Sequence, residues 1–452
     1  MRSGPAAVLL PPALFSRASS TSSVLEVARS AREAARKLAA LPLEDRNDAL
    51  NRVASALENA KTEIETANKS DCEIAAKPES NVAPPLQARL KFGGSKFRDT
   101  IQGVRDLMKL EDPIGRIQLH RELDQGLVLK RKTVPLGVLG IIFEARPDAA
   151  VQIASLGIKS GNGVLLKCGR EAVGSCRAIV SAIKDGLKTS KASPDVVALL
   201  TTREETAEMM KMKEYVDLII PRGSNSFVQY VMQNTDIPVL GHADGICHIF
   251  VDKAAEIQKA VEIATDSKIQ YPSACNAVET ILVHEAVAKQ FLEAFGSRAE
   301  KEGIEIRGCQ GTLKHVKGAE AVEADWSTEY GDKIVSVKIV PSMESAMQHI
   351  NTYGSRHTDC IITEDASAAA VFQSQVDAAG VYWNCSTRFA DGFRYGFGAE
   401  VGISTSMMPP RGPVGLEGLV TYRYIMTGNG HVVKSYTGDG AKPFTHKNLP
   451  LQ

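Results

Sequence analysis

The chain has 452 residues. A single hydrophobic core stops growing at roughly 250–300 residues, so this length predicts more than one domain. The 53 basic and 53 acidic side chains cancel, so no overall field favours nucleic acid or a membrane as a partner, and any anion must be held by local residues. The eight cysteines form no CxxC pair and have no metal-ligand spacing with histidine, so neither a disulfide framework nor a metal site is predicted.

Residues 1–24 have the composition of an organellar transit peptide, with arginine, many serines and no carboxylate before Glu26. Such a leader predicts import into a mitochondrion or a plastid. The alternative is a start without an address, which leaves the protein in the cytoplasm. No apolar run is long enough to span a bilayer, which takes roughly 20 residues.

The first structured segment after the leader is helical. Within residues 44–71, apolar residues recur at helical spacing from Leu50 to Ile64 and predict one long amphipathic helix. Residues 126–137 alternate apolar and basic side chains, as a half-exposed strand does, which indicates an arm or a sheet edge.

Short runs rich in β-branched residues then alternate with helical segments such as 171–187 and 253–265. Near-continuous apolar strands separated by helices are typical of parallel sheets covered on both faces. Their number exceeds one sheet and predicts two α/β units with a break near residue 240. The runs are 138–143, 163–167, 196–200, 216–220, 247–252, 278–283 and 360–363.

Two strand ends could hold a nucleotide, although neither G-x-G-x-x-G nor a phosphate loop occurs in the sequence. At 219–231 a strand leads through Gly223 and Ser224 into a helix, whose first N–H groups could meet a pyrophosphate. An ordinary serine-capped turn has the same pattern. Lys167 ends the strand 163–167 and Arg170 follows it before a helix, at the edge where open sheets bind ligands, although a solvated loop would look the same.

Cys275 lies where a polar loop runs into the strand 278–283. A thiol held near N–H donors at such a place can act as a nucleophile on a carbonyl carbon. The alternative is a structural cysteine.

Taken in order, these stretches resemble the gamma-glutamyl phosphate reductase family of the aldehyde dehydrogenase superfamily, and the reductase half of bifunctional pyrroline-5-carboxylate synthases. The resemblance covers about residues 25–435 and is carried by motifs such as IPRGSNSFV, VLGHADGICHIFVD, QYPSACNAVETILVH and WNCSTRFADGFRYGFG. It implies an α/β, aldehyde dehydrogenase-like fold with two doubly wound domains, for cofactor and catalysis, and a small β oligomerisation arm.

The boundaries expected on this basis are as follows: leader 1–24; cofactor domain 25–115 and 135–239; catalytic domain 240–378; arm 116–134 and about 400–436; irregular tail 437–452.

The resemblance also implies an activity, the NADPH-dependent reduction of L-glutamyl 5-phosphate to L-glutamate 5-semialdehyde and phosphate, the second step of proline biosynthesis from glutamate. Cys275 falls on the nucleophile and would carry a thioester. A homo-oligomer is expected, with glutamate 5-kinase as a possible partner. The alternatives are another semialdehyde or acylating aldehyde dehydrogenase and a non-catalytic partner of that kinase.

Further roles are carried over from the family. Lys167 matches the lysine on the adenine ribose, and Arg170 replaces a glutamate of NAD-preferring relatives, which favours NADPH because a guanidinium can pair with a 2′-phosphate. Gly223 and Ser224 match the turn over the pyrophosphate, and Glu329 matches the carboxylate on the nicotinamide ribose.

At the reacting carbon, Asn276 and the Cys275 N–H are candidates for the oxyanion site, and Arg146 for the departing phosphate. Leu240 stands where hydrolytic relatives carry a glutamate base. The amino-acid end of the substrate is expected near His357, Asp359 and Asn384. A packing role is the alternative for each side chain.

Overall fold

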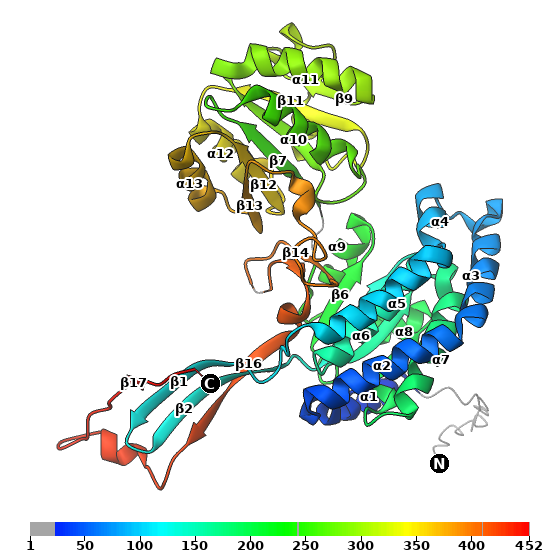
Figure 1. Cartoon of the computed structure of the whole chain (residues 1–452), viewed down its shortest axis with the longest axis vertical. Helices are drawn as coiled ribbons and strands as arrows, with labels where there is room; N and C mark the ends of the chain where they lie inside the picture. The colour runs from blue at the N-terminus through cyan, green and yellow to red at the C-terminus, as the bar shows by residue number, and fades with distance from the viewer. Residues whose placement is uncertain (1–22, 242–243, 409, 452) are drawn as a thin grey trace, which may run out of the picture.

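The computed structural model describes residues 23–241, 244–408 and 410–451. Residues 1–22 of the expected leader lie outside this range. Figure 1 shows two α/β domains with a β arm projecting beside the first, which confirms the predicted fold class. Among the described residues, no helix combines the length and apolar character required to cross a bilayer.

The first domain is built on a parallel sheet with the strand order β5-β4-β3-β6. Successive residues of β3 point to opposite faces: Ile141 lies in a core with α2, α6 and α7, whereas Ile142 lies in a core with α1. Apolar residues therefore fill both faces, as a doubly wound sheet requires. The strands are β3 (Val138–Phe143), β4 (Gly163–Cys168), β5 (Val197–Leu200) and β6 (Leu218–Arg222).

The helices of this domain precede the sheet, connect its strands or, in the case of α9, follow its last strand. The first of them begins at a capping box, in which Ser23 and Glu26 satisfy each other's backbone N–H groups. They are α1 (Val24–Ala40), α2 (Leu43–Asn59), α3 (Lys61–Ala75), α4 (Pro84–Leu90), α5 (Gly94–Lys109), α6 (Pro147–Lys159), α7 (Val173–Lys188), α8 (Arg203–Met209) and α9 (Asn225–Gln233).

The second domain holds a seven-stranded parallel sheet with the order β10-β9-β11-β8-β7-β12-β13. One face packs against α10 (Ile257–Ile269) and α11 (Ala288–Glu302), the other against α12 (Met343–Tyr353) and α13 (Ala366–Gln375). The strands are β7 (Cys247–Val251), β8 (Val278–His284), β9 (Glu305–Gly308), β10 (Ala319–Glu320), β11 (Ile334–Val340), β12 (Thr358–Ile362) and β13 (Gly380–Trp383).

The arm is an antiparallel sheet with the order β16-β2-β1-β17. Its strands are β1 (Ile117–Asp124), β2 (Leu127–Pro135), β16 (Val420–Thr427) and β17 (Lys447–Asn448). A separate hairpin of β14 (Gly402–Ser404) and β15 (Gly412–Val414) lies between the domains and the arm (Figure 1).

Four expectations differ from the structure. The helix over 44–71 is interrupted at Ala60, whose ψ of 5° separates α2 from α3. The arm returns at β16 rather than near residue 400, because β14 pairs with β15 instead. The catalytic sheet continues beyond residue 378 to β13. The tail is not wholly irregular, since β17 adds an edge to β1 through backbone pairing that the sequence pattern does not reveal.

Candidate active site

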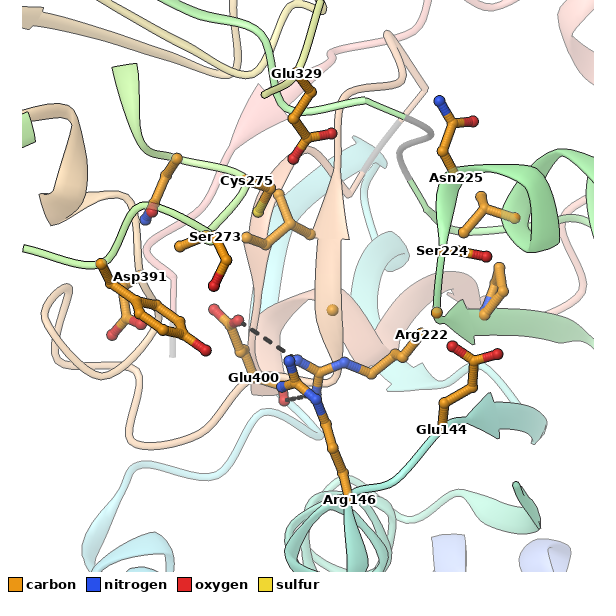
Figure 2. Close-up of a pocket in the computed structure, with 18 of the residues that line it drawn as sticks. Glu144, Arg146, Arg222, Ser224, Asn225, Ser273, Cys275, Glu329, Asp391 and Glu400 are labelled. Atoms are coloured by element: carbon orange, nitrogen blue, oxygen red, sulfur yellow. Dashed lines mark hydrogen bonds and ion pairs between the residues drawn. The ribbon is translucent and has the colours of Figure 1, made fainter. Parts of the chain in front are cut away.

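A cavity of about 390 Å³ lies between the two α/β domains, and Cys275 is on its wall (Figure 2). The catalytic domain contributes Cys275, Asn276 and Glu329, and the cofactor domain contributes Arg146 and Arg222. The cysteine stands in the turn between α10 and β8, partly exposed. A nucleophile at this place can meet ligands held by either domain.

The turn that carries Cys275 is fixed by short backbone contacts. Ala277 donates its N–H to the Ala274 carbonyl at 2.8 Å. Gly245 packs on the other side, and the thiol of Cys247 donates to the Cys275 carbonyl with an S···O distance of 3.4 Å. Burial raises the pKa of the Cys247 thiol, which keeps that cysteine neutral.

Glu329 lies on the opposite side of Cys275 from Arg146 and Arg222 (Figure 2). Its Oε2 accepts the Gly245 N–H at 2.9 Å, so the carboxylate has a fixed place at the cavity wall. This position suits a group that holds a ribose hydroxyl.

Asn276 is buried, and its Nδ2 donates to the Ala390 carbonyl at 2.7 Å. An amide nitrogen carries two hydrogens, so one of them is available to a second acceptor. The Oδ1 atom is buried without a hydrogen-bond partner among the described residues. The side chain is thus oriented by Ala390 next to the nucleophile.

The residues expected to hold the cofactor line two adjoining cavities. Gly223, Ser224 and Glu329 line the first, whereas Lys167 and Arg170 line a second of about 720 Å³. Glu144 lines both cavities. An extended ligand could therefore run from Arg170 to the cysteine.

The N-terminus of α9 is suited to an anion such as a pyrophosphate. Ser224 is its N-cap residue, but its side chain makes no capping bond and pairs with the Ser226 hydroxyl at 3.2 Å. A Cβ on Gly223 would stand 2.9 Å from a ring carbon of Phe227 and 3.0 Å from Oε2 of Glu144, so glycine avoids crowding these two side chains. These features fit a dinucleotide phosphate at the helix start.

Four arginines line the cavity with the nucleophile: Arg89, Arg146, Arg222 and Arg388. Figure 2 shows the guanidinium groups of Arg146 and Arg222 beside each other. Burial, followed by the charges of Arg222 and Arg89, lowers the pKa of Arg146. Arg222 reaches Glu400, with an N···O distance of 3.9 Å. In the described part of the chain, no acceptor or carboxylate pairs with Arg146.

Three residues expected near the substrate do not line this cavity. Asp359 is buried and accepts the His248 N–H at 2.9 Å. His357 is buried, with Nδ1 2.9 Å from the Thr358 hydroxyl. Asn384 exchanges hydrogen bonds with the Thr363 backbone at 3.0 and 2.9 Å. Because these groups serve the catalytic domain's own strands, the structure favours packing roles for them.

The sequence had singled out Arg146 but not Arg89, Arg222 or Arg388. Arg222 lies in the motif IPRGSNSFV, directly before Gly223, and Arg388 lies within the motif WNCSTRFADGFRYGFG, so both positions could have been found from those motifs. Arg89 lies at the end of α4 and carries no comparable signal, since only the tertiary structure brings it to the cavity.

Comparison with known proteins agrees with this arrangement. The model of the aldehyde dehydrogenase family matches residues 14–305. A gamma-glutamyl phosphate reductase of Trichormus variabilis is 60% identical over 429 residues, which cover 95% of this chain and 98% of that protein. This chain belongs to the aldehyde dehydrogenase family, in its gamma-glutamyl phosphate reductase branch. Members of the family use a nicotinamide dinucleotide as cofactor.

Two further gamma-glutamyl phosphate reductases are similar to this chain. The enzyme of Nostoc punctiforme is 61% identical, again over 95% of this chain and 98% of that protein. The crystal structure of the Thermotoga maritima gamma-glutamyl phosphate reductase superposes with a TM-score of 0.88 at 40% identity, covering 91% of this chain and 100% of that one.

Proposed function

We propose that this protein reduces L-glutamyl 5-phosphate to L-glutamate 5-semialdehyde and phosphate, with NADPH as the hydride donor. The observation that carries this proposal is the presence of Cys275 and the unpaired Arg146 in one cavity. Arg146 is only partly buried, but it forms no ion pair among the described residues, so its charge favours an anionic ligand in the cavity. A cavity that joins a thiol to such a cation suits an acyl phosphate, in which the carbon to be attacked carries a phosphate.

The first step is attack by the Cys275 thiolate on the acyl carbon. A C–S bond forms, the C–O bond to phosphate breaks, and phosphate leaves with the bonding pair. Arg146 and Arg222 stabilise the negative charge of the leaving group. The developing oxyanion accepts hydrogen bonds from the backbone N–H of Cys275 and from the second Nδ2 hydrogen of Asn276.

The product of this step is a glutamyl thioester on Cys275. When bound, the dinucleotide would supply the hydride that reduces the carbonyl carbon of this thioester. The C–S bond then breaks, the pair returns to sulfur, and the aldehyde leaves. Glu329, held by Gly245, would bind the nicotinamide ribose and so orient the cofactor near the cysteine.

The residue at position 240 favours reduction of the thioester over its hydrolysis. Leu240 is buried in the apolar core of the cofactor domain, so this position supplies no carboxylate to activate water. A general base contributes roughly 10²–10⁴-fold to such a step. The thioester can therefore persist until reduction.

NADPH rather than NADH is proposed because of the charge at the second cavity. Lys167, Arg170 and Arg203 line it, and the latter two are exposed. Guanidinium groups there can pair with a 2′-phosphate.

The arm is proposed to form a homo-oligomer, because its edge strand β16 exposes Tyr422, Tyr424, Ile425 and Met426.

We also propose that the leader directs import of the protein into a mitochondrion or a plastid. A fluorescent fusion of residues 1–24 tests it, with diffuse fluorescence as the contrary result.

The covalent step can be observed directly. The protein is incubated with pyrroline-5-carboxylate, the cyclic form of the semialdehyde, and with NADP⁺ but no phosphate. Mass spectrometry is expected to find a glutamyl adduct on Cys275 that disappears when phosphate is added. An adduct on another residue, or none, would contradict the proposal. Cys275→Ala is the control.

A further inference from the structure

Two buried residues of opposite charge lie in the interior of the catalytic domain, on the elements that flank the turn with Cys275. Lys268 on α10 and Glu279 on β8 form an ion pair with an N···O distance of 2.7 Å, and both side chains are at most 1% exposed. Neither lines the cavity that contains Cys275. Burying such a pair costs desolvation free energy that an apolar pair of similar volume would not incur. A role in positioning other groups would account for this cost.

Both members of the pair also bind one loop. Lys268 donates to the Asp332 carbonyl at 3.3 Å. The Gly331 N–H donates to Oε1 of Glu279 at 3.5 Å. Gly331 has a φ of 63°, a left-handed conformation in which glycine avoids strain, so the loop turns sharply at this point. The pair thus holds two backbone groups of consecutive residues.

The same loop begins with Glu329, the carboxylate at the cavity wall. Glu329 accepts the Gly245 N–H, and Gly245 packs on the backbone of Cys275. The loop is held at three places: by the buried pair, by the Tyr330 hydroxyl, which donates to Asp325 at 2.7 Å, and by Gly245 at the cavity. The buried pair holds the backbone that directly follows Glu329 and Tyr330, so its loss would let this backbone shift and move the Glu329 carboxylate with it.

We propose that Lys268 and Glu279 are positioning residues, which hold the loop 329–332 so that Glu329 can bind the nicotinamide half of the cofactor. The inference rests on the proposed function for the identity of that cofactor. Neither side chain touches the ligand. The adenosine half, bound near Lys167 and Arg170, should not depend on the pair.

The decisive variant removes both charges together. Lys268→Met with Glu279→Leu leaves no unpaired buried charge, and replacements of this kind are often neutral or stabilising, so the domain should fold. Glu279→Gln is a second variant that preserves volume. Lys259→Met is the matched control, since Lys259 lies on the same helix and forms an exposed pair with Glu364.

Calorimetry would measure the dissociation constants of two ligands, NADP⁺ and adenosine 2′,5′-bisphosphate, which lacks the nicotinamide ribose. In the double variant and in Glu279→Gln, we expect about 10-fold weaker binding of NADP⁺ and unchanged binding of the bisphosphate, as one lost hydrogen-bonding contact would give. Lys259→Met should bind both ligands as the wild type does.

Equal affinity of the variants and the wild type for NADP⁺ would overturn the positioning role, and so would a matching loss for both ligands. Wild-type protein that binds the bisphosphate but not NADP⁺ would overturn the role assigned to Glu329. Failure of the wild type to bind either ligand would instead refute the proposed function, so the two failures are distinguishable.

Discussion

The backbone of Gly245 lies so close to the backbone of Cys275 that a Cβ atom on Gly245 would stand 2.1 Å from the Cys275 carbonyl oxygen. No side chain fits into this space, because the nearest atoms are backbone and cannot rotate away. The glycine therefore places the nucleophile and, through its N–H, Glu329 at the same time.

Replacing Gly245 by alanine should consequently displace the turn that carries Cys275. We expect turnover to fall by about 100-fold, since a misplacement near 1 Å can have this effect. Gly241→Ala is the control, because a Cβ there meets its neighbours at an ordinary 3.5 Å. Equal activity of both variants in a steady-state assay would argue against the close approach.

The phosphate role of the arginines predicts a selective defect. Arg146→Met should raise the KM for phosphate in the reverse reaction by roughly 10- to 100-fold, the range expected for a lost charge-assisted hydrogen bond. Arg146→Lys should recover part of the loss. Arg105→Met, which breaks an exposed pair with Glu58, should have no effect. A higher KM for pyrroline-5-carboxylate alone would reassign Arg146 to the amino-acid end.

Coenzyme preference is expected to depend on Arg170. Arg170→Glu should lower kcat/KM with NADP⁺ by about 10- to 100-fold and leave the value with NAD⁺ unchanged or higher, because a carboxylate repels the 2′-phosphate. Arg177→Glu makes the same charge change on α7, outside both cavities. An equal loss of kcat/KM in both variants, or an equal loss with both coenzymes, would show that Arg170 does not bind the 2′-phosphate.

Glu279 predicts a pH dependence of stability. Its pKa is raised to about 7, mainly by burial and in part by the charge of Glu329, against the lowering effect of Lys268. Between the usual value of 4.5 and pH 7, the folded chain holds a proton that the unfolded chain has released, and the pair with Lys268 is fully ionised only above pH 7. The stability contributed by this group is therefore present below pH 4.5 and is lost as the pH rises through 7.

Urea midpoints of wild type and Glu279→Gln at several pH values between 5 and 8 would test this sign. The wild-type midpoint minus that of the variant should decrease as the pH rises. A difference that is constant or that increases would contradict the raised pKa.

Much of the architecture could be predicted because the apolar runs are short and nearly continuous. Strands such as β3 and β8 are buried on both faces and leave little ambiguity. The break at Ala60 and the β17 pairing escaped prediction, because neither changes the local pattern of apolar residues. Backbone pairing between distant segments depends on tertiary contacts.

The site was predictable to the extent that single motifs carry it. Cys275, Gly223 and Glu329 each sit in a recognisable stretch, and the structure brings them to one cavity. Asp359 is an equally plausible ligand-binding residue from the sequence, but in the structure its carboxylate is hydrogen-bonded to the buried side chain of His248. A sequence cannot distinguish a polar side chain that faces a cavity from one satisfied inside a sheet.

The central claim is that Cys275 holds the glutamyl chain as a thioester that phosphate, and not water, releases. The most direct measurement mixes the protein with pyrroline-5-carboxylate and NADP⁺ without phosphate and follows NADPH absorbance. The account predicts a burst of about one NADPH per active site that then stops, and steady turnover once phosphate is added. Continuous NADPH formation without phosphate would contradict it.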